Sequence, residues 1–394
     1  MHPSLRVAAR LSALAAGLTV AVTGVATAHP TARADRPHRS PVIGHVYVND
    51  NTTPANTIAG FDRHADGTLT PIPGSPFATG GAGTGAGIGS QGALQTAPGG
   101  RELLAVDAGS NQISQLWIGR DGRLWPVPGG TIASQGNEPV SIAVARDLVY
   151  VANSGAGASD YAGFAFDRFG RLRPIPGATF PLPDTAQPGD VLINSTATRL
   201  VGTRVGTSQI DSFTIDGRGD LHAAPGSPFA AQGPGPFGSE FDPIDPGQVF
   251  VSNAHGGPNA GTVSAFDDGP QGVLSSIGAS PFPNGQTAPC WVEITRDGRH
   301  LFAVNTAVPS VSSYRIRRDG ALRLIQNTPF SEANAATLGP EDARLSPDDA
   351  TLWVVDTKGD AVSAFAVRGG RLTQIDAAPT ALPAGAAPFG IVVN

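Results

Sequence analysis

The sequence is poor in charged residues and almost devoid of lysine and cysteine. Only 15% of its 394 residues are charged, the net charge is -6, and Lys358 is the single lysine. A chain without a basic stripe cannot neutralise many phosphates, so we expect no nucleic-acid partner. Cys290 is the one cysteine, so the fold cannot depend on an internal disulfide.

The first 28 residues have the composition of an export signal. Arg6 and Arg10 precede an apolar stretch over residues 11–25, and Ala26-Thr27-Ala28 offers a small-Xaa-small cleavage site. This order is typical of a signal peptide and predicts a secreted or cell-envelope protein that is cleaved near Ala28. An uncleaved membrane anchor is the alternative, although glycine and alanine make the stretch weakly hydrophobic.

The next segment, residues 29–42, is polar and contains prolines, which indicates a flexible tether. Beyond it, glycine and proline remain abundant, with 51 and 35 copies in the chain, but they recur between short apolar runs. Turn residues at regular intervals indicate many short strands rather than disorder. We therefore expect one folded domain over residues 43–394.

One unit is repeated seven times in this domain. Each unit contains an apolar strand with a polar last residue, then an aromatic-bearing strand, a glycine turn such as Asp66-Gly67 and an Xaa-Leu-Xaa strand. A further strand, usually preceded by proline, comes before each unit. Four strands in about 50 residues is the pattern of a β-propeller blade. The polar strand ends lie 46 to 58 residues apart, at Asn49, Asp107, Asn153, Thr203, Asn253, Asn305 and Asp356.

The repeat count also predicts how the ring closes. The first copy begins on a second strand, at Val46, and the last copy is a first strand at residues 391–393. Pairing the two fragments completes one blade and removes two exposed sheet edges. We therefore predict an all-β fold, a seven-bladed propeller of four-stranded antiparallel blades whose C-terminal strand joins the N-terminal blade. An open array of hairpins is the alternative and would leave edges unpaired.

The first strands of such a ring line a central channel. The loops that enter them share one face with the loops that follow the second strands, and we expect the functional site on that face. The opposite face carries tight glycine turns, which leave little room for chemistry.

Period-two alternation places Asp342 and Arg344 on one side of a strand, with Glu293 and Glu240 at the level of Arg344 on the two preceding blades. Asp190 lies at the level of Asp342. Carboxylates that flank an arginine can bind a polar ligand or supply a general base. A structural ion-pair network is the alternative.

Other site chemistry has little support in the sequence. Residues 80–92 are glycine-rich but precede no helix, so we predict a flexible inter-blade loop rather than a phosphate-binding loop. Asp267-Asp268 and Asp348-Asp349 lack calcium-loop spacing. We expect no cofactor and no metal, and a monomer that takes a small polar molecule or another extracellular ligand.

The repeated motifs resemble those of the lactonase-type seven-bladed propellers, a family that includes 6-phosphogluconolactonases and 3-carboxymuconate cyclases. They are the strand ends Val151-Ala152-Asn153 and Ala303-Val304-Asn305, the turn Asp297-Gly298-Arg299 and the Asp-Gly-Xaa-Leu hairpins. The resemblance covers about residues 43–394. It implies a lactone hydrolase or a related cyclase that acts on a small polar substrate at the central channel.

Family enzymes commonly begin a channel strand with Pro-Arg-His and end a strand with Asn-Glu. The corresponding positions here read Pro236-Phe237-Gly238, Pro289-Cys290-Trp291 and Asn253-Ala254-His255. A non-catalytic propeller that binds a protein, a glycan or a small ligand on the same face is therefore the alternative function. The candidate catalytic residues are His255, Glu293 and Glu240, and the candidate substrate-binding residues are Arg344, Asp342, Asp190, Trp291 and Cys290.

Overall fold

The computed structural model describes residues 40–331, 339–375 and 379–394. The predicted export signal and residues 29–39 of the predicted tether lie outside the described residues. The first strand begins at Val42, one residue before the predicted start of the propeller. In the described part of the chain, no helix has the length and hydrophobicity needed to cross a membrane.

The described chain forms seven antiparallel sheets, or blades, and three short 3-10 helices. The helices are η1 (Ala108–Ser110), η2 (Asp184–Ala186) and η3 (Pro270–Gly272). Blade one contains β1 (Val42–Asn49), β2 (Thr57–His64), β3 (Leu69–Pro71), β4 (Phe77–Ala78) and β32 (Ile391–Val393). Blade two contains β5 (Leu94–Thr96), β6 (Glu102–Asp107), β7 (Gln112–Ile118) and β8 (Leu124–Ala133).

The next three blades repeat this order of strands. Blade three contains β9 (Pro139–Ala145), β10 (Leu148–Asn153), β11 (Asp160–Phe166) and β12 (Leu172–Pro181). Blade four contains β13 (Pro188–Ile193), β14 (Arg199–Arg204), β15 (Gln209–Ile215), β16 (Leu221–Ala223) and β17 (Phe229–Ala230). Blade five contains β18 (Pro236–Phe241), β19 (Gln248–Asn253), β20 (Thr262–Asp268), β21 (Leu274–Ser276) and β22 (Phe282–Pro283).

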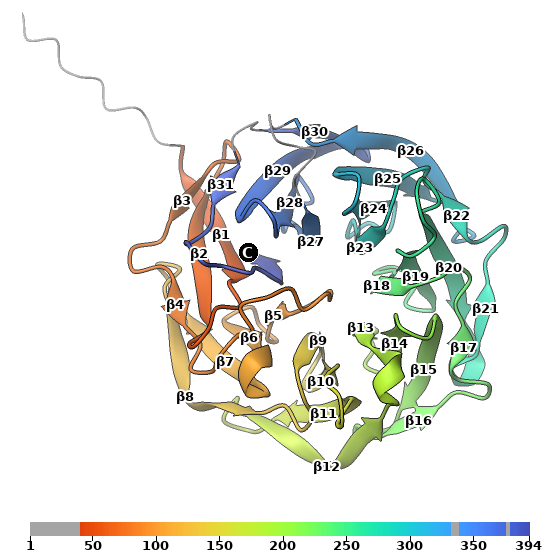
Figure 1. Ribbon diagram of the computed structural model, residues 1–394, viewed down its shortest axis with the longest axis horizontal. Helices are drawn as coiled ribbons and strands as arrows, with labels where there is room; N and C mark the ends of the chain where they lie inside the picture. The colour runs from red at the N-terminus through yellow and green to blue at the C-terminus, as the bar shows by residue number, and fades with distance from the viewer. Residues whose placement is uncertain (1–39, 332–338, 376–378) are drawn as a thin grey trace, which may run out of the picture. The chain divides into compact units, whose positions relative to one another are not determined.

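Two more blades complete the ring around a common centre, which the innermost strands line (Figure 1). The predicted seven-bladed propeller is confirmed. Blade six contains β23 (Pro289–Ile294), β24 (His300–Asn305), β25 (Ser310–Ile316) and β26 (Leu322–Pro329). Blade seven contains β27 (Pro340–Leu345), β28 (Thr351–Asp356), β29 (Ala361–Arg368), β30 (Arg371–Gln374) and β31 (Thr380–Ala381).

Tyrosines on the second strands tie neighbouring blades together. The Tyr47 hydroxyl, on β1, donates to the carbonyl of Gly122 in the hairpin turn of blade two, at 2.7 Å. The Tyr150 hydroxyl, on β10, donates to the carbonyl of Gly219 in the corresponding turn of blade four, at 2.5 Å. Both side chains are fully buried, so these bonds satisfy hydroxyl groups that would otherwise be costly to bury.

The outermost strand is interrupted in several blades, and there a serine hydroxyl accepts a backbone N–H of the neighbouring strand. In blade one, β3 and β4 both pair with β2. Between them, Ser75 Oγ accepts the N–H of Gly60 at 2.8 Å. Ser227 and Ser280 accept backbone N–H groups in the same way in blades four and five. A hydroxyl therefore replaces the ladder partner that the strand lacks there.

The ring is closed by β32, which pairs with β1 in the register Val46↔Val393, Tyr47↔Val392 and Val48↔Ile391. Asn394 extends the closure, because its Oδ1 accepts the N–H of His45 at 2.8 Å and its carbonyl accepts Arg63 Nη2 at 3.1 Å. Ile391 is completely buried. The predicted closure is confirmed, and the C-terminal strand supplies core as well as hydrogen bonds.

We predict that removing residues 389–394 destabilises the whole propeller. The four buried apolar side chains of this segment contribute roughly 1.5–3 kcal/mol each to the free energy of unfolding. Their sum is comparable with the stability of a typical domain. The milder Ile391→Ala change should lower the free energy of unfolding by about 3 kcal/mol, measured by urea denaturation. Val42→Ala, at an exposed position on β1, is the control. An unchanged unfolding curve for the truncated protein would contradict this closure.

Candidate functional site

Three neighbouring inner strands bring Glu240, Glu293 and Arg344 together. They lie on β18, β23 and β27, which succeed one another around the channel. Each residue pairs with the position three before the polar end of the second strand, in the registers Glu240↔Phe250, Glu293↔Phe302 and Arg344↔Trp353. The three side chains therefore occupy one level of the channel, as the alternation of the sequence predicted.

Arg344 and Glu293 form a closed ion pair. Arg344 Nη1 lies 2.9 Å from Glu293 Oε1, and the other carboxylate oxygen accepts the N–H of Leu345 at 3.2 Å. Arg344 Nε donates to the carbonyl of Ile391 at 3.5 Å. Burial lowers the pKa of Arg344, but the carboxylates around it, Glu293 foremost, outweigh this and raise it above its usual value. The guanidinium therefore stays charged.

Glu240 is the carboxyl group of this cluster without a hydrogen bond from any described residue. It is partly exposed and lines a cavity of the channel. Burial raises its pKa well above the usual value, and repulsion from Glu293 raises it further. Burial also raises the pKa of Glu293 to about 7, although Arg344 opposes the shift. Both carboxyl groups therefore hold a proton to higher pH than an ordinary glutamate does.

Two more carboxyl groups lie one level further along the channel. Asp190 accepts the Ser141 hydroxyl at 3.0 Å and, through its other oxygen, the hydroxyl and N–H of Ser239 at 2.6 and 2.8 Å. Asp342 accepts the N–H groups of Gly92 and Ala343. Burial raises the pKa of Asp190 to about 7 and that of Asp342 to about 6.

The loop before β5 plugs the channel, where the sequence predicted a flexible inter-blade loop. In Figure 1 this segment reaches from the rim into the middle of the ring. Ser90 accepts the Trp291 indole N–H on its carbonyl at 2.7 Å and donates its hydroxyl to Val140. Gln91 Nε2 donates to the Ser239 carbonyl at 2.9 Å, and its Oε1 accepts the N–H of Val292 at 3.0 Å. Both residues are buried.

Between the plug and the face of tight turns, the channel contains a cavity of about 240 Å³. The cavity lies toward Ser195, Asp242 and Pro243, in the turns where the inner strands β13 and β18 end. It therefore opens on the face of tight turns, and the expectation that this face leaves little room for chemistry is wrong. The polar residues that line it are Gln91, Gln95, Asp190, Ser195, Glu240, Asp242 and Arg344.

The remaining candidates lie at the plug or beyond it, toward the loop face. His255 is exposed in the loop after β19, packed so closely on Gly235 that a Cβ there would overlap its ring. Gly235 and Glu240 are five positions apart in the chain, roughly 15 Å at the rise of a strand. The structure therefore does not bring His255 to the carboxylate cluster.

Trp291 and Cys290 start β23 next to the plug. Trp291 is 1% exposed, and its indole N–H is taken by Ser90. Cys290 is buried, which raises the pKa of its thiol to about 12. The described residues contain no group of three or more His, Cys, Asp or Glu side chains that could hold a metal ion.

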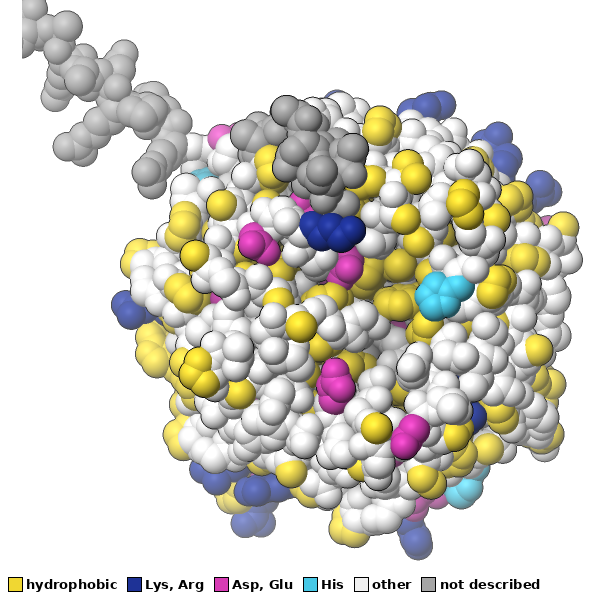
Figure 2. Space-filling view, viewed as in Figure 1, with side chains coloured by type: hydrophobic (Ala, Val, Ile, Leu, Met, Phe, Trp, Pro, Cys, Tyr) yellow, Lys and Arg dark blue, Asp and Glu magenta, His cyan; other side chains and the backbone are white. Residues whose placement is uncertain are grey.

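Figure 2 shows acidic side chains scattered singly over the loop face and hydrophobic side chains at the bottom of its central hollow.

A family model described as "Lactonase, 7-bladed beta-propeller" matches residues 241–392. The matched part contains Glu293 and Arg344 and ends inside β32. Residues 241–392 are therefore similar in sequence to the lactonase-type propellers. No curated protein sequence matches the chain.

Solved structures share the propeller fold of this chain. A protein of Bacteroides uniformis provisionally named a 6-phosphogluconolactonase superposes with a TM-score of 0.70 at 16% identity, covering 89% of this chain and 99% of that one. A second, from Bacteroides fragilis, gives 0.67 at 18% identity, covering 89% and 98%. The periplasmic gluconolactonase of Pseudomonas aeruginosa gives 0.65 at 15% identity, covering 89% and 98%.

The sequence did not identify the residues that donate hydrogen bonds to the buried carboxylates. It also did not identify the plug, which separates the cavity from the loop face. Ser141 and Ser239 bind Asp190, and Gln91 bridges blades five and six. One signal of the plug was available. The first interval between strand ends, from Asn49 to Asp107, is the longest of the set, and it contains the segment that forms the plug.

We predict that the propeller loses stability as the pH rises from 5 to 8. The folded pKa values of Asp190 and Glu293 lie near 7, above the values near 4 of an unfolded chain. The folded state therefore binds more protons between these values, and its stability falls as pH rises through the folded pKa. Calorimetry should show a melting temperature about 5 °C lower at pH 8 than at pH 5. Asp190→Asn should reduce this difference, and an opposite slope would refute the assignment.

Gln91→Ala should destabilise the protein by about 2 kcal/mol, because it leaves the Ser239 carbonyl and the Val292 N–H buried without partners. Urea unfolding monitored by circular dichroism measures the change. Gln135→Ala is the control, since the Gln135 side chain is exposed and bonds only two residues away, to Ala133. Equal stability of the two variants would show that the plug is not held by Gln91.

Proposed function

We propose that this propeller hydrolyses a small polar lactone in the channel cavity. The observation that carries the proposal is Glu240, a carboxyl group without hydrogen-bond partners among the described residues, in a polar cavity that also contains Arg344. A carboxylate with a raised pKa is a stronger base than an ordinary one and suits general-base chemistry near neutral pH. The lactonase names of the structural neighbours support the choice of substrate class.

In the proposed reaction, the Glu240 carboxylate takes a proton from a water molecule as the water oxygen bonds to the lactone carbonyl carbon. The carbonyl electron pair moves onto its oxygen, where Arg344 stabilises the negative charge. The ring C–O bond then breaks, and protonated Glu240 returns the proton to the departing alkoxide. The product is the open hydroxy acid. Glu293 takes no proton in this scheme and orients Arg344 through the 2.9 Å ion pair.

The size of the cavity limits the substrate. Its volume of about 240 Å³ is below the roughly 300 Å³ at which pockets for drug-sized ligands begin. We therefore propose a single lactone ring with hydroxyl substituents. Because the sequence predicts export, the proposal places the reaction outside the cytoplasm.

Binding without turnover is the second candidate function. The observation that favours it is the Arg344–Glu293 pair, since a guanidinium already neutralised at 2.9 Å offers less charge to a developing oxyanion. In that case the same cavity holds a small polar ligand and releases it unchanged.

We predict that Glu240→Gln lowers kcat/KM for lactone hydrolysis by about 100-fold or more, because the amide cannot accept the proton. A pH-stat assay with glucono-1,5-lactone and unsubstituted γ- and δ-lactones measures the rate, corrected for spontaneous hydrolysis. Wild-type activity should fall as the pH is lowered through the raised pKa of Glu240, because the base must be ionised. Glu138→Gln, at a partly exposed position before β9, is the control.

The outcomes separate the two functions. Turnover that survives in Glu240→Gln contradicts the role of Glu240. Saturable binding of a lactone in calorimetry, with no hydrolysis above background, supports the non-catalytic function instead. The absence of both binding and turnover across the panel rejects lactones as ligands.

A further inference from the structure

Three cavities lie in line on the propeller, outside the channel, across blades two, three and four. Their volumes are about 400, 360 and 340 Å³. The first two share Glu102 and Gly170, and the last two share Arg146 and Asp147. Adjacent cavities with common walls form one extended depression, which we call the rim groove.

The outer end of the rim groove is an aromatic platform. Glu102, Trp117 and Trp125 stand directly opposite one another on β6, β7 and β8, so the three side chains project from one side of blade two. Trp117 and Trp125 are each 45% exposed, and Phe169, from the turn of blade three, is 73% exposed. Large aromatic side chains in this protein are otherwise mostly buried. Aromatic surface gathered in this way marks a binding site.

The walls of the platform are fixed in place. Gln115 Nε2 donates to Glu102 Oε2 at 2.5 Å and to the carbonyl of Gly170, across the gap between blades two and three, at 2.6 Å. Gln115 Oε1 also accepts the N–H of Leu172 at 3.3 Å. One buried amide therefore sets the separation of the two walls, and the groove is preorganised.

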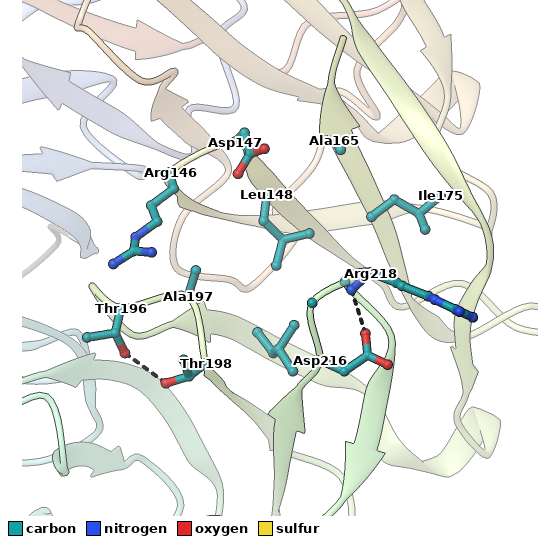
Figure 3. Close-up of a pocket in the computed structure, with 13 residues that line it drawn as sticks. Arg146, Asp147, Leu148, Ala165, Ile175, Thr196, Ala197, Thr198, Asp216 and Arg218 are labelled. Atoms are coloured by element: carbon teal, nitrogen blue, oxygen red, sulfur yellow. Dashed lines mark hydrogen bonds between the residues drawn. The ribbon is translucent and has the colours of Figure 1, made fainter.

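The inner end of the rim groove is polar and lies beside the mouth of the channel. Figure 3 shows Arg146 and Thr196 on one side of this cavity and Ile175 and Arg218 on the other. Val144 and Ser195, which lie close to Arg146 and Thr196 in the chain, line the channel cavity. The groove thus runs from the exposed indoles to the opening beside the carboxylate cluster.

We propose that the rim groove binds an oligosaccharide chain. A sugar ring has an apolar C–H face, which stacks on an indole, and hydroxyl groups at its edge, which bond carboxylate, guanidinium and hydroxyl groups. The groove offers both along its length. Its charged lining is nearly balanced, which suits a neutral sugar rather than a polyanion. The lining contains Arg101, Arg146, Arg171 and Arg218 against Glu102, Asp147 and Asp216.

The size of the aromatic surface argues against a protein partner. Two half-exposed indoles and one largely exposed phenyl ring present roughly 300–400 Å². A stable protein complex needs about 800 Å² from each partner. Three cavities in line fit a chain of rings better than one ring. The proposal is independent of lactone hydrolysis, because none of the groove residues named above belongs to the carboxylate cluster.

Titration calorimetry with cellohexaose and chitohexaose tests the proposal on the full chain. We expect saturable binding of at least one of them and a change in tryptophan fluorescence, since Trp117 and Trp125 are exposed whereas Trp291 and Trp353 are buried. Trp117→Ala should weaken binding by about fivefold or more. Phe169→Ala should also weaken it and, because Phe169 is 73% exposed, gives a second variant with little effect on folding.

Leu324→Ala, at an exposed position on the outer strand of blade six, is the matched control and should bind like the wild type. Melting temperatures of all variants exclude unfolding as the cause. No binding of either hexasaccharide, or binding that Trp117→Ala and Phe169→Ala leave unchanged, would overturn the proposal. Stronger binding to oligogalacturonate than to both neutral probes would also overturn it, because it would assign the groove to a polyanion.

Discussion

The pairing of β32 with β1 is the constraint on which the rest of the propeller depends. Three residue pairs join the two ends of the described domain, and they fix the inner strands around one axis. The closing strand also contacts the carboxylate cluster, because Arg344 Nε donates to the carbonyl of Ile391 at 3.5 Å. A ring that opened at this pairing would expose sheet edges and would also lose a hydrogen-bond partner of Arg344.

The inner strands bring four carboxyl groups close together, and protonation of these groups reduces the repulsion between their negative charges. Asp190, Glu240, Glu293 and Asp342 face the interior near a single guanidinium, that of Arg344. Full ionisation of all four would leave buried negative charge without compensation, which is costly. Burial instead raises the pKa of each carboxyl group. The cluster therefore lowers the stability of the folded state as the pH rises through these raised pKa values.

The repeat made the ring and the level of the charged residues predictable, because both follow from strand spacing and period-two alternation. Glu240, Glu293 and Arg344 meet where that alternation placed them. The plug could not be derived in this way. Gln91 bonds Ser239 and Val292, which are 148 and 201 residues away, and no local pattern encodes such a partner. The sequence therefore placed the candidate site on the loop face, whereas the cavity opens on the face of tight turns.

The plug also changes which surface the chemistry faces. With Ser90 and Gln91 seated between the loop face and the carboxylates, the cavity is reached past Ser195 and Asp242. The rim groove has its inner end on the same turns, at Arg146 and Thr196. A sugar chain held on Trp117 would therefore extend toward the mouth of the cavity that contains Glu240. The chain segments that carry Arg146 and Thr196 also carry Val144 and Ser195 of the channel cavity, so the inner end of the groove lies next to that cavity.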